Sequence, residues 1–376
     1  MTLNREEMEL RQVLQRYQQQ AQIAQQQGNA QGLREAMLGQ IEPCARLAQL
    51  RVHDYDFIGA NAYLEHLRQM VDWLGIEAPT PEKNGLQARL LHTEAIVLDV
   101  QGSYDLFDKM DFVDAPVELE QAEKRYEQTA ELASKLGVDR AAVQGVQGQA
   151  LRVRGIRLLG QGKYNIEAAD TRQAQAQLKE SKKTLEQAAR QLRPLAQTGQ
   201  LDAQSAMYPD YCSSLAFYAQ ASFFRAQADE SIFKGDYLRC ARSLSQQIEA
   251  LQQAKGPLLG LSGRVPDSLA HRLAQEIELC HKRQKHFAAE AEKQPRRSFT
   301  LGTITFVVLA LGSILAQLWG FSYFNFKAEP FLYIVAVAVA FAIGGVGAGL
   351  ATWGEATAFF RQMAKGVSKN KGETER

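Results

Sequence analysis

Cysteine is scarce in this sequence and is never closely paired. The four cysteines, Cys44, Cys212, Cys240 and Cys280, lie far apart, and no two of them form a CxxC motif. Disulfide frameworks and zinc sites both need cysteines at short, recurring spacings. We therefore expect reduced, buried thiols in a cytosolic compartment.

The chain also lacks an excess of charge of either sign. Its formal net charge is +1 at pH 7, and residues 1–297 carry nearly equal numbers of basic and acidic side chains. Proteins that bind nucleic acid usually present a strongly basic surface, so nucleic acid is not expected as the main partner. The first residues, Met1 to Glu7, are charged and have no apolar stretch. No cleavable signal peptide is expected.

Motifs for catalysis or cofactor binding are lacking too. Gly160-Gln-Gly162-Lys163 resembles the end of a phosphate-binding loop, but the earlier glycine and the Ser or Thr after the lysine are missing. His281 and His286 are five residues apart, whereas two zinc ligands on one helical face are four apart. We expect a protein that is not an enzyme and that holds no cofactor or metal. A catalytic constellation assembled from different helices would leave no such local motif.

Alternation of apolar and polar residues, the period of a β-strand, is lacking over any long stretch. Apolar residues instead recur at spacings of three and four, the period of an α-helix. The clearest such face, within residues 57–74, is formed by Tyr63, Leu64, Leu67, Met70, Val71 and Leu74. The pattern, interrupted by Gly, Pro and Asp, predicts an all-α fold.

Three short motifs recur along the predicted helices. Each has a large residue, a small residue four positions later, and Gly-x-Tyr seven positions after that. The three glycines lie 60 and 73 residues apart. The members are Leu91, Ala95, Gly102 and Tyr104; Leu151, Gly155, Gly162 and Tyr164; and Phe224, Ala228, Gly235 and Tyr237. We interpret each Gly-x-Tyr as a turn that ends one helix and begins the next.

This order of residues resembles the tetratricopeptide repeat, whose helix-turn-helix signature carries a large residue, a small residue, Gly and Tyr. The resemblance covers residues 85–255 and implies an α-solenoid that binds peptides. An irregular helical array whose turns use Gly-x-Tyr is the alternative. We predict a helical-repeat domain over residues 1–255, followed by a hinge and connecting helix over 256–297.

Long apolar runs are found only near the end of the chain. Ser298 to Phe326 is a run of 29 residues without a charged side chain, and Pro330 to Gly354 is another of 25. A bilayer core about 30 Å thick needs roughly 20 apolar residues per helix. Residues 298–354 are therefore predicted to form a transmembrane hairpin with spans at about 300–323 and 330–353.

Basic and aromatic residues orient this hairpin. Arg296 and Arg297 precede it, and Arg361 and Lys365 follow it in a basic tail over residues 355–376, while Lys327 is the only basic residue between the spans. The positive-inside rule places both termini in the cytoplasm, most simply at a bacterial inner membrane. Trp319 and Trp353 are expected at the two membrane interfaces.

Small residues line one face of the second span. They recur every fourth position, with a neighbouring GxxxG pair, as in helix interfaces within lipid. The residues are Ala336, Ala340, Gly344, Gly345, Ala348, Gly349 and Thr352. The face is expected to pack against the first span or against a second copy of the chain.

Two hypotheses for the function follow. The first is a membrane-anchored helical-repeat adaptor that binds a protein or peptide partner, with the aromatic helix at residues 211–234 as core or groove wall. The alternative is a membrane effector, of the kind used in bacterial immunity, whose hairpins oligomerise to permeabilise the bilayer. The two differ in whether the membrane becomes leaky.

Overall fold

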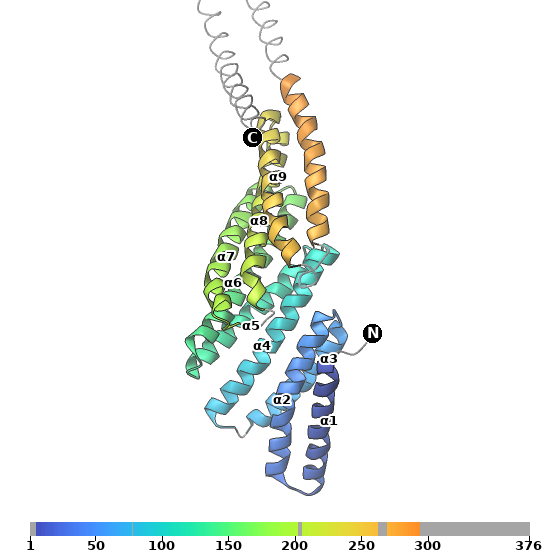
Figure 1. The fold of residues 1–376 in the computed structure, drawn as a ribbon, viewed down its shortest axis with the longest axis vertical. Coiled ribbons are helices and arrows are strands. Elements are labelled where there is room, and N and C mark those ends of the chain that lie inside the picture. The colour runs from blue at the N-terminus through green and yellow to red at the C-terminus, as the bar shows by residue number, and fades with distance from the viewer. Residues whose placement is uncertain (1–4, 77, 202–204, 262–268, 294–376) are drawn as a thin grey trace, which may run out of the picture. The chain divides into compact units, whose positions relative to one another are not determined.

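The computed structural model describes residues 5–76, 78–201, 205–261 and 269–293 (Figure 1). The chain divides into two compact units, Met1–Gln284 and Lys285–Arg376. No helix within the described ranges is both long and apolar enough to cross a membrane. The predicted hairpin at residues 298–354 lies outside these ranges. Its predicted packing face and all the membrane-interface residues named above, from Arg296 to Lys365, also lie outside them.

The described residues contain helices and turns but no β-strand, which confirms the all-α prediction. The α-helices in chain order are α1 (Arg5–Gln26), α2 (Ala30–His53), α3 (Phe57–Gly75), α4 (Thr80–Tyr104), α5 (Ala115–Lys135), α6 (Arg140–Glu167), α7 (Thr171–Gln197), α8 (Tyr208–Phe233) and α9 (Tyr237–Gly260). A π-helical turn, η1 (Asp105–Lys109), continues α4, and a 3-10 turn, η2 (Ser205–Met207), precedes α8. Residues 269–284, called the terminal helix below, are the last helical residues of the first unit.

Each helix packs mainly against its neighbours along the chain. All consecutive pairs from α1 to α9 are in contact, and α2 also contacts α4, as α6 contacts α8. Contacts confined to neighbours and next neighbours are the mark of a repeat-like helical array. The prediction of a helical array is therefore confirmed for the first unit.

Four turns between helices share one backbone design. In each, a residue with left-handed φ is followed by an Asp or Asn that caps the next helix. The pairs are Gly28-Asn29, Tyr55-Asp56, Ala169-Asp170 and Gly235-Asp236. Each capping carboxylate or amide oxygen accepts from the backbone N–H three residues on, at 2.9–3.0 Å, and the capping residue's own N–H donates to the carbonyl five residues back. A Schellman ending joined directly to a side-chain cap makes a short turn, which sets the two helices antiparallel.

The predicted Gly-x-Tyr turns are wrong at two of their three positions. Gly102 and Tyr104 lie in the last turn of α4, and Gly162 and Tyr164 lie inside α6. The third motif does lie at a turn, because Gly235 has a φ of 69° and Tyr237 begins α9. Gly102 and Gly162 have a different role, which is close packing between helices.

The close packing is clearest between α6 and α7. Three glycines of α6, spaced seven residues apart, each face a leucine of α7 from an equally spaced series. The pairs are Gly148 with Leu192, Gly155 with Leu185 and Gly162 with Leu178. A Cβ atom placed on any of these glycines would lie 2.5–2.6 Å from the nearest leucine carbon. The two helices therefore approach more closely than any larger residue would allow.

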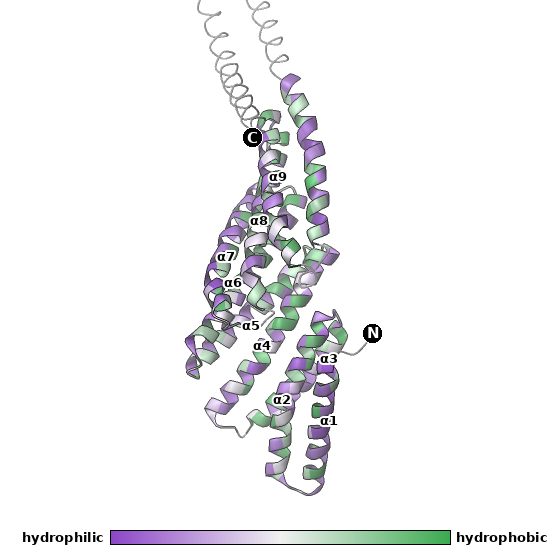
Figure 2. Cartoon of the chain, in the orientation of Figure 1, coloured by the Kyte–Doolittle hydropathy of each residue, from purple (hydrophilic) through white to green (hydrophobic). Residues whose placement is uncertain are grey.

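The main hydrophobic core runs from α4 through α9 into the terminal helix. It includes Leu258, Leu269 and Leu273, which lie beyond residue 255, where the sequence pattern placed the end of the helical domain. Figure 2 shows α1 as largely hydrophilic at the other end of the unit, because glutamine occupies most positions outside its apolar face.

Candidate functional site

A groove lies between α5 and α6. It has a volume of about 650 Å³, and Gln191 of α7 also lines it. The lining from α5 includes Glu123, Glu127, Ala130, Glu131, Ser134 and Lys135, and that from α6 includes Gln147, Ala150, Leu151 and Arg154. Small side chains at Ala130 and Ala150 leave the space open.

The charges of this groove are unequally satisfied. Glu123 lies 2.9 Å from the Arg157 guanidinium and 3.9 Å from that of Arg154, so its charge is balanced. Glu131 is paired with Lys135 at 2.6 Å. Glu127 is exposed and makes no ion pair with any residue that the structure describes. The groove therefore combines an apolar floor with a carboxylate that is available to a basic group.

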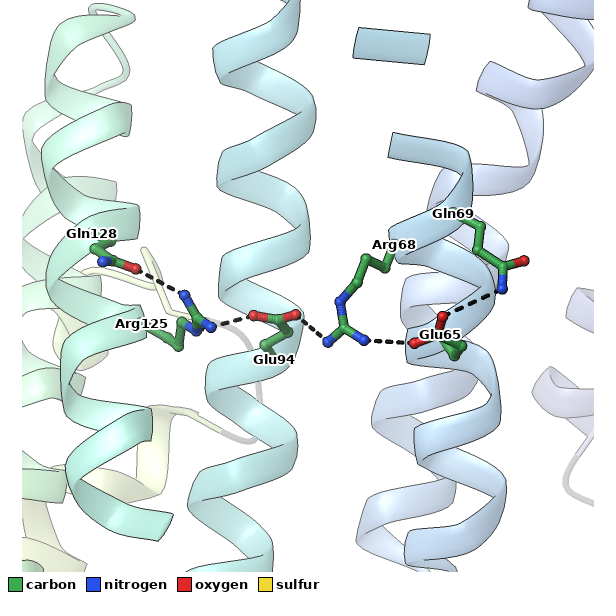
Figure 3. Close-up of polar contacts among 6 residues, drawn as sticks. All are labelled: Glu65, Arg68, Gln69, Glu94, Arg125 and Gln128. Atoms are coloured by element: carbon green, nitrogen blue, oxygen red, sulfur yellow. Dashed lines mark hydrogen bonds and ion pairs between the residues drawn. The ribbon is translucent and has the colours of Figure 1, made fainter. Parts of the chain in front are cut away.

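A polar chain holds the other side of α5 in place. Figure 3 shows Glu94 of α4 between Arg68 of α3 and Arg125 of α5. Its two oxygens lie 2.7 Å from the Arg68 guanidinium and 3.1 Å from the Arg125 guanidinium. Because Glu94 is buried and bonds to both neighbours, it sets the spacing of three consecutive helices and keeps α5 in position beside the groove.

A buried ion pair lies in the core next to the groove. Asp99 of α4 and Arg152 of α6 are each 4% exposed at the side chain and pair with each other. The Tyr126 hydroxyl donates to Asp99 at 3.3 Å, and the Arg152 guanidinium lies 4.2 Å from the centre of the Tyr208 ring. Burial acts to lower the pKa of Arg152, but the charge and hydrogen bond of Asp99, together with Tyr208 and Tyr126, outweigh it and the pKa is raised. The Arg152 guanidinium therefore stays charged in the core.

A second buried polar group is centred on Lys163, which is 8% exposed. Its ammonium donates to the Tyr218 hydroxyl of α8 and lies 3.8 Å from Glu276 of the terminal helix. Burial lowers the pKa of Lys163. The lysine of the incomplete phosphate-loop motif thus bonds to protein groups in the core. Tyr218, from the aromatic helix, is also a core residue, whereas Phe233 of that helix is exposed.

An acidic pair joins the π-helical turn to the next helix, with Asp105 in η1 and Glu118 in the first turn of α5. Burial, and then the neighbouring Asp105, raise the pKa of Glu118 from 4.5 to about 7. A carboxyl group whose pKa is higher in the folded state stabilises the fold at low pH. That stability is lost as the pH rises through the folded pKa.

We therefore expect the free energy of unfolding to fall as the pH rises from 4.5 to about 7. Thermal unfolding followed by circular dichroism over this range measures the effect. Glu118→Gln cannot ionise and should flatten the dependence. An unchanged slope in this variant would show that other groups cause it.

Among the described residues, no group of three or more His, Cys, Asp or Glu side chains is arranged to hold a metal ion. All four cysteines are reduced and buried, and burial raises the pKa of each thiol. This agrees with the buried, reduced thiols predicted from the sequence.

Of the residues singled out from the sequence, few reach the groove. Tyr104 packs instead on Tyr55 and Phe57, with ring centres 4.9 and 5.5 Å away. Leu151, the large residue of the second motif, does line the groove. The groove carboxylates Glu127 and Glu131 were missed, because surface glutamates on a helix carry no pattern that separates binding from solvation.

Comparison with known proteins adds little. No family model matches the chain, and no curated protein matches it. One solved structure aligns, a "circular tandem repeat protein with novel repeat topology and enhanced subunit contact surfaces", with 13% identity and a TM-score of 0.20. The alignment covers 76% of this chain and 66% of that one, just under two thirds of its length.

Proposed function

We propose that the protein is a non-enzymatic adaptor whose helical array binds a segment of a partner protein in the groove between α5 and α6. The observation that carries the proposal is the groove itself, in which Ala130, Ala150 and Leu151 lie beside the unpaired Glu127. Such a lining suits a segment with small apolar side chains and one basic residue. Grooves between the paired helices of repeat arrays commonly bind segments of this kind.

The proposal also assigns the apolar residues 298–354 the role of a membrane anchor. In it, the two spans hold the array at the cytoplasmic face of a bacterial inner membrane. The small-residue face of the second span would join the spans or pair two copies of the chain. The tetratricopeptide resemblance supports the binding role through Leu151, which belongs to the second motif and lines the groove.

A site-specific photo-crosslinker tests the groove. Benzoylphenylalanine at Gln147, on the exposed rim of the groove, should yield one discrete adduct when the full-length chain is irradiated in cells. Glu127→Lys in the same chain should reduce that adduct by about tenfold, since losing a good charge contact costs about 1.4 kcal/mol.

The matched control places the crosslinker at Glu180, an exposed position of α7 that does not line the groove. It should give no adduct of the same mass. Equal adducts at Gln147 and Glu180, or an adduct that survives Glu127→Lys unchanged, would contradict binding in the groove.

A further inference from the structure

The terminal helix departs from the neighbour-to-neighbour packing of the array. Arg272 donates to the backbone carbonyls of Phe107 and Asp108 in η1, and the bond to Asp108 is 2.7 Å long. These residues are 165 and 164 positions apart in sequence. The carbonyls belong to the end of a π-helical turn, where backbone acceptors are left without partners in the helix. An arginine from another segment meets that need.

One turn further along, the terminal helix meets α6 and α8. The Tyr218 hydroxyl donates to Glu276 at 2.9 Å, and the buried Lys163 ammonium lies 3.8 Å from the same carboxylate. Two turns beyond, Arg283 lies 2.7 Å from Asp229 of α8. The charged residues that make these contacts therefore alternate in sign along the terminal helix: Arg272, Glu276 and Arg283. Each lies on a different turn of that helix.

Apolar contacts accompany the polar ones. Leu269, Leu273 and Cys280 are buried in the main core, and Ile277 packs partly against it. The helix thus presents the face of an ordinary helical ligand, with apolar residues at spacings of three and four and charged residues beside them.

The polar half of this interface contributes specificity more than stability. Lys163 is buried, whereas the Glu276 side chain is 28% exposed, so the cost of removing the lysine from water opposes the gain from their attraction and the pair has a modest net effect. An occupant with a carboxylate at this position is nevertheless favoured, because it balances the charge of Lys163, whose ammonium otherwise contacts the Tyr218 hydroxyl and the Tyr218 and Phe112 rings.

We propose that the face formed by η1, α6 and α8 is a helix-binding surface, occupied in cis by the terminal helix and open in exchange to a partner helix of the same chemistry. That partner carries an arginine for the η1 carbonyls and a glutamate four residues later for Lys163 and Tyr218, within an apolar stripe. This surface is separate from the α5–α6 groove and does not depend on the function proposed for it.

Hydrogen exchange on the unaltered full-length chain is the first test. The terminal helix should exchange its amide protons on the order of tenfold or more faster than α8, because it opens as a separate unit. Exchange of both at the same rate would mean that the helix leaves only when the array unfolds, and would overturn the proposal.

A peptide of residues 269–284 with a fluorescent label gives the second test. The full-length Arg272→Ala/Glu276→Ala variant should bind it saturably, whereas the unaltered chain, whose surface is occupied, should bind it at least about tenfold more weakly. A control peptide with Arg272 and Glu276 exchanged has the same composition and should bind neither chain. Equal binding of the two peptides to the variant, or no binding of the first, would contradict the inference.

Discussion

Replacing Asp99 with alanine is expected to lower the free energy of unfolding by about 3–5 kcal/mol. The substitution leaves the Arg152 guanidinium buried without its carboxylate and removes the acceptor of the Tyr126 hydroxyl. A charge left alone in a core costs more than the pair contributed, because water cannot replace the lost partner. Urea unfolding of the full-length chain, followed by circular dichroism, measures the loss.

Glu42→Ala is the matched control for this experiment. Glu42 pairs with Arg89 of another helix at 2.5 Å, but its side chain is 70% exposed. An exposed pair contributes about 0–1 kcal/mol, so the control should unfold almost as the unaltered chain does. Asp99→Leu combined with Arg152→Met should recover part of the lost stability, since no buried charge remains. Similar losses for Asp99→Ala and Glu42→Ala would show that the buried pair has no special role.

Replacing Gly155 with leucine is expected to destabilise the fold by about 2–3 kcal/mol. A Cβ atom at this position already lies 2.5 Å from Leu185 Cγ and 3.3 Å from the Leu185 backbone nitrogen. Because a backbone atom is involved, α6 and α7 must move apart, and the leucines on either side lose contact as well. The change is measured as a lower urea midpoint.

Gly85→Leu separates crowding from helix propensity. Gly85 also lies within a helix, and a Cβ there has no neighbouring atom within 4 Å. Leucine forms helix better than glycine by about 0.8 kcal/mol, so this variant should be slightly more stable than the unaltered chain. If Gly155→Leu also raised the urea midpoint, that result would contradict the close packing of α6 against α7 at Gly155.

The helices could be predicted from the sequence because their signal is local. The apolar spacing around Leu67 and Met70 reflects one buried face of one helix, and both residues are fully buried. The turns could not be predicted as well, since glycine has two uses that look alike in a sequence. Gly235 adopts a left-handed φ, whereas Gly162 makes room for Leu178 on another helix.

The recurring turn was missed for a related reason. Two of its four left-handed positions are Tyr55 and Ala169, and neither residue type signals that conformation. The Asp or Asn that follows is the more constant feature. In the groove, the space comes from Ala130 and Ala150 on different helices, so its existence depends on helix spacing rather than on any one segment.

The contact between Arg272 and η1 sets an order of events during synthesis of the chain. Neighbouring helices of the array meet soon after each pair is made, because little chain separates them. The Asp108 carbonyl in η1, by contrast, cannot bind the Arg272 guanidinium until the 164 residues that follow Asp108 have been synthesised. During synthesis, every molecule thus passes through a state in which the array has formed but this surface is not yet covered. A partner present at that time could bind the surface before the chain's own terminal helix does.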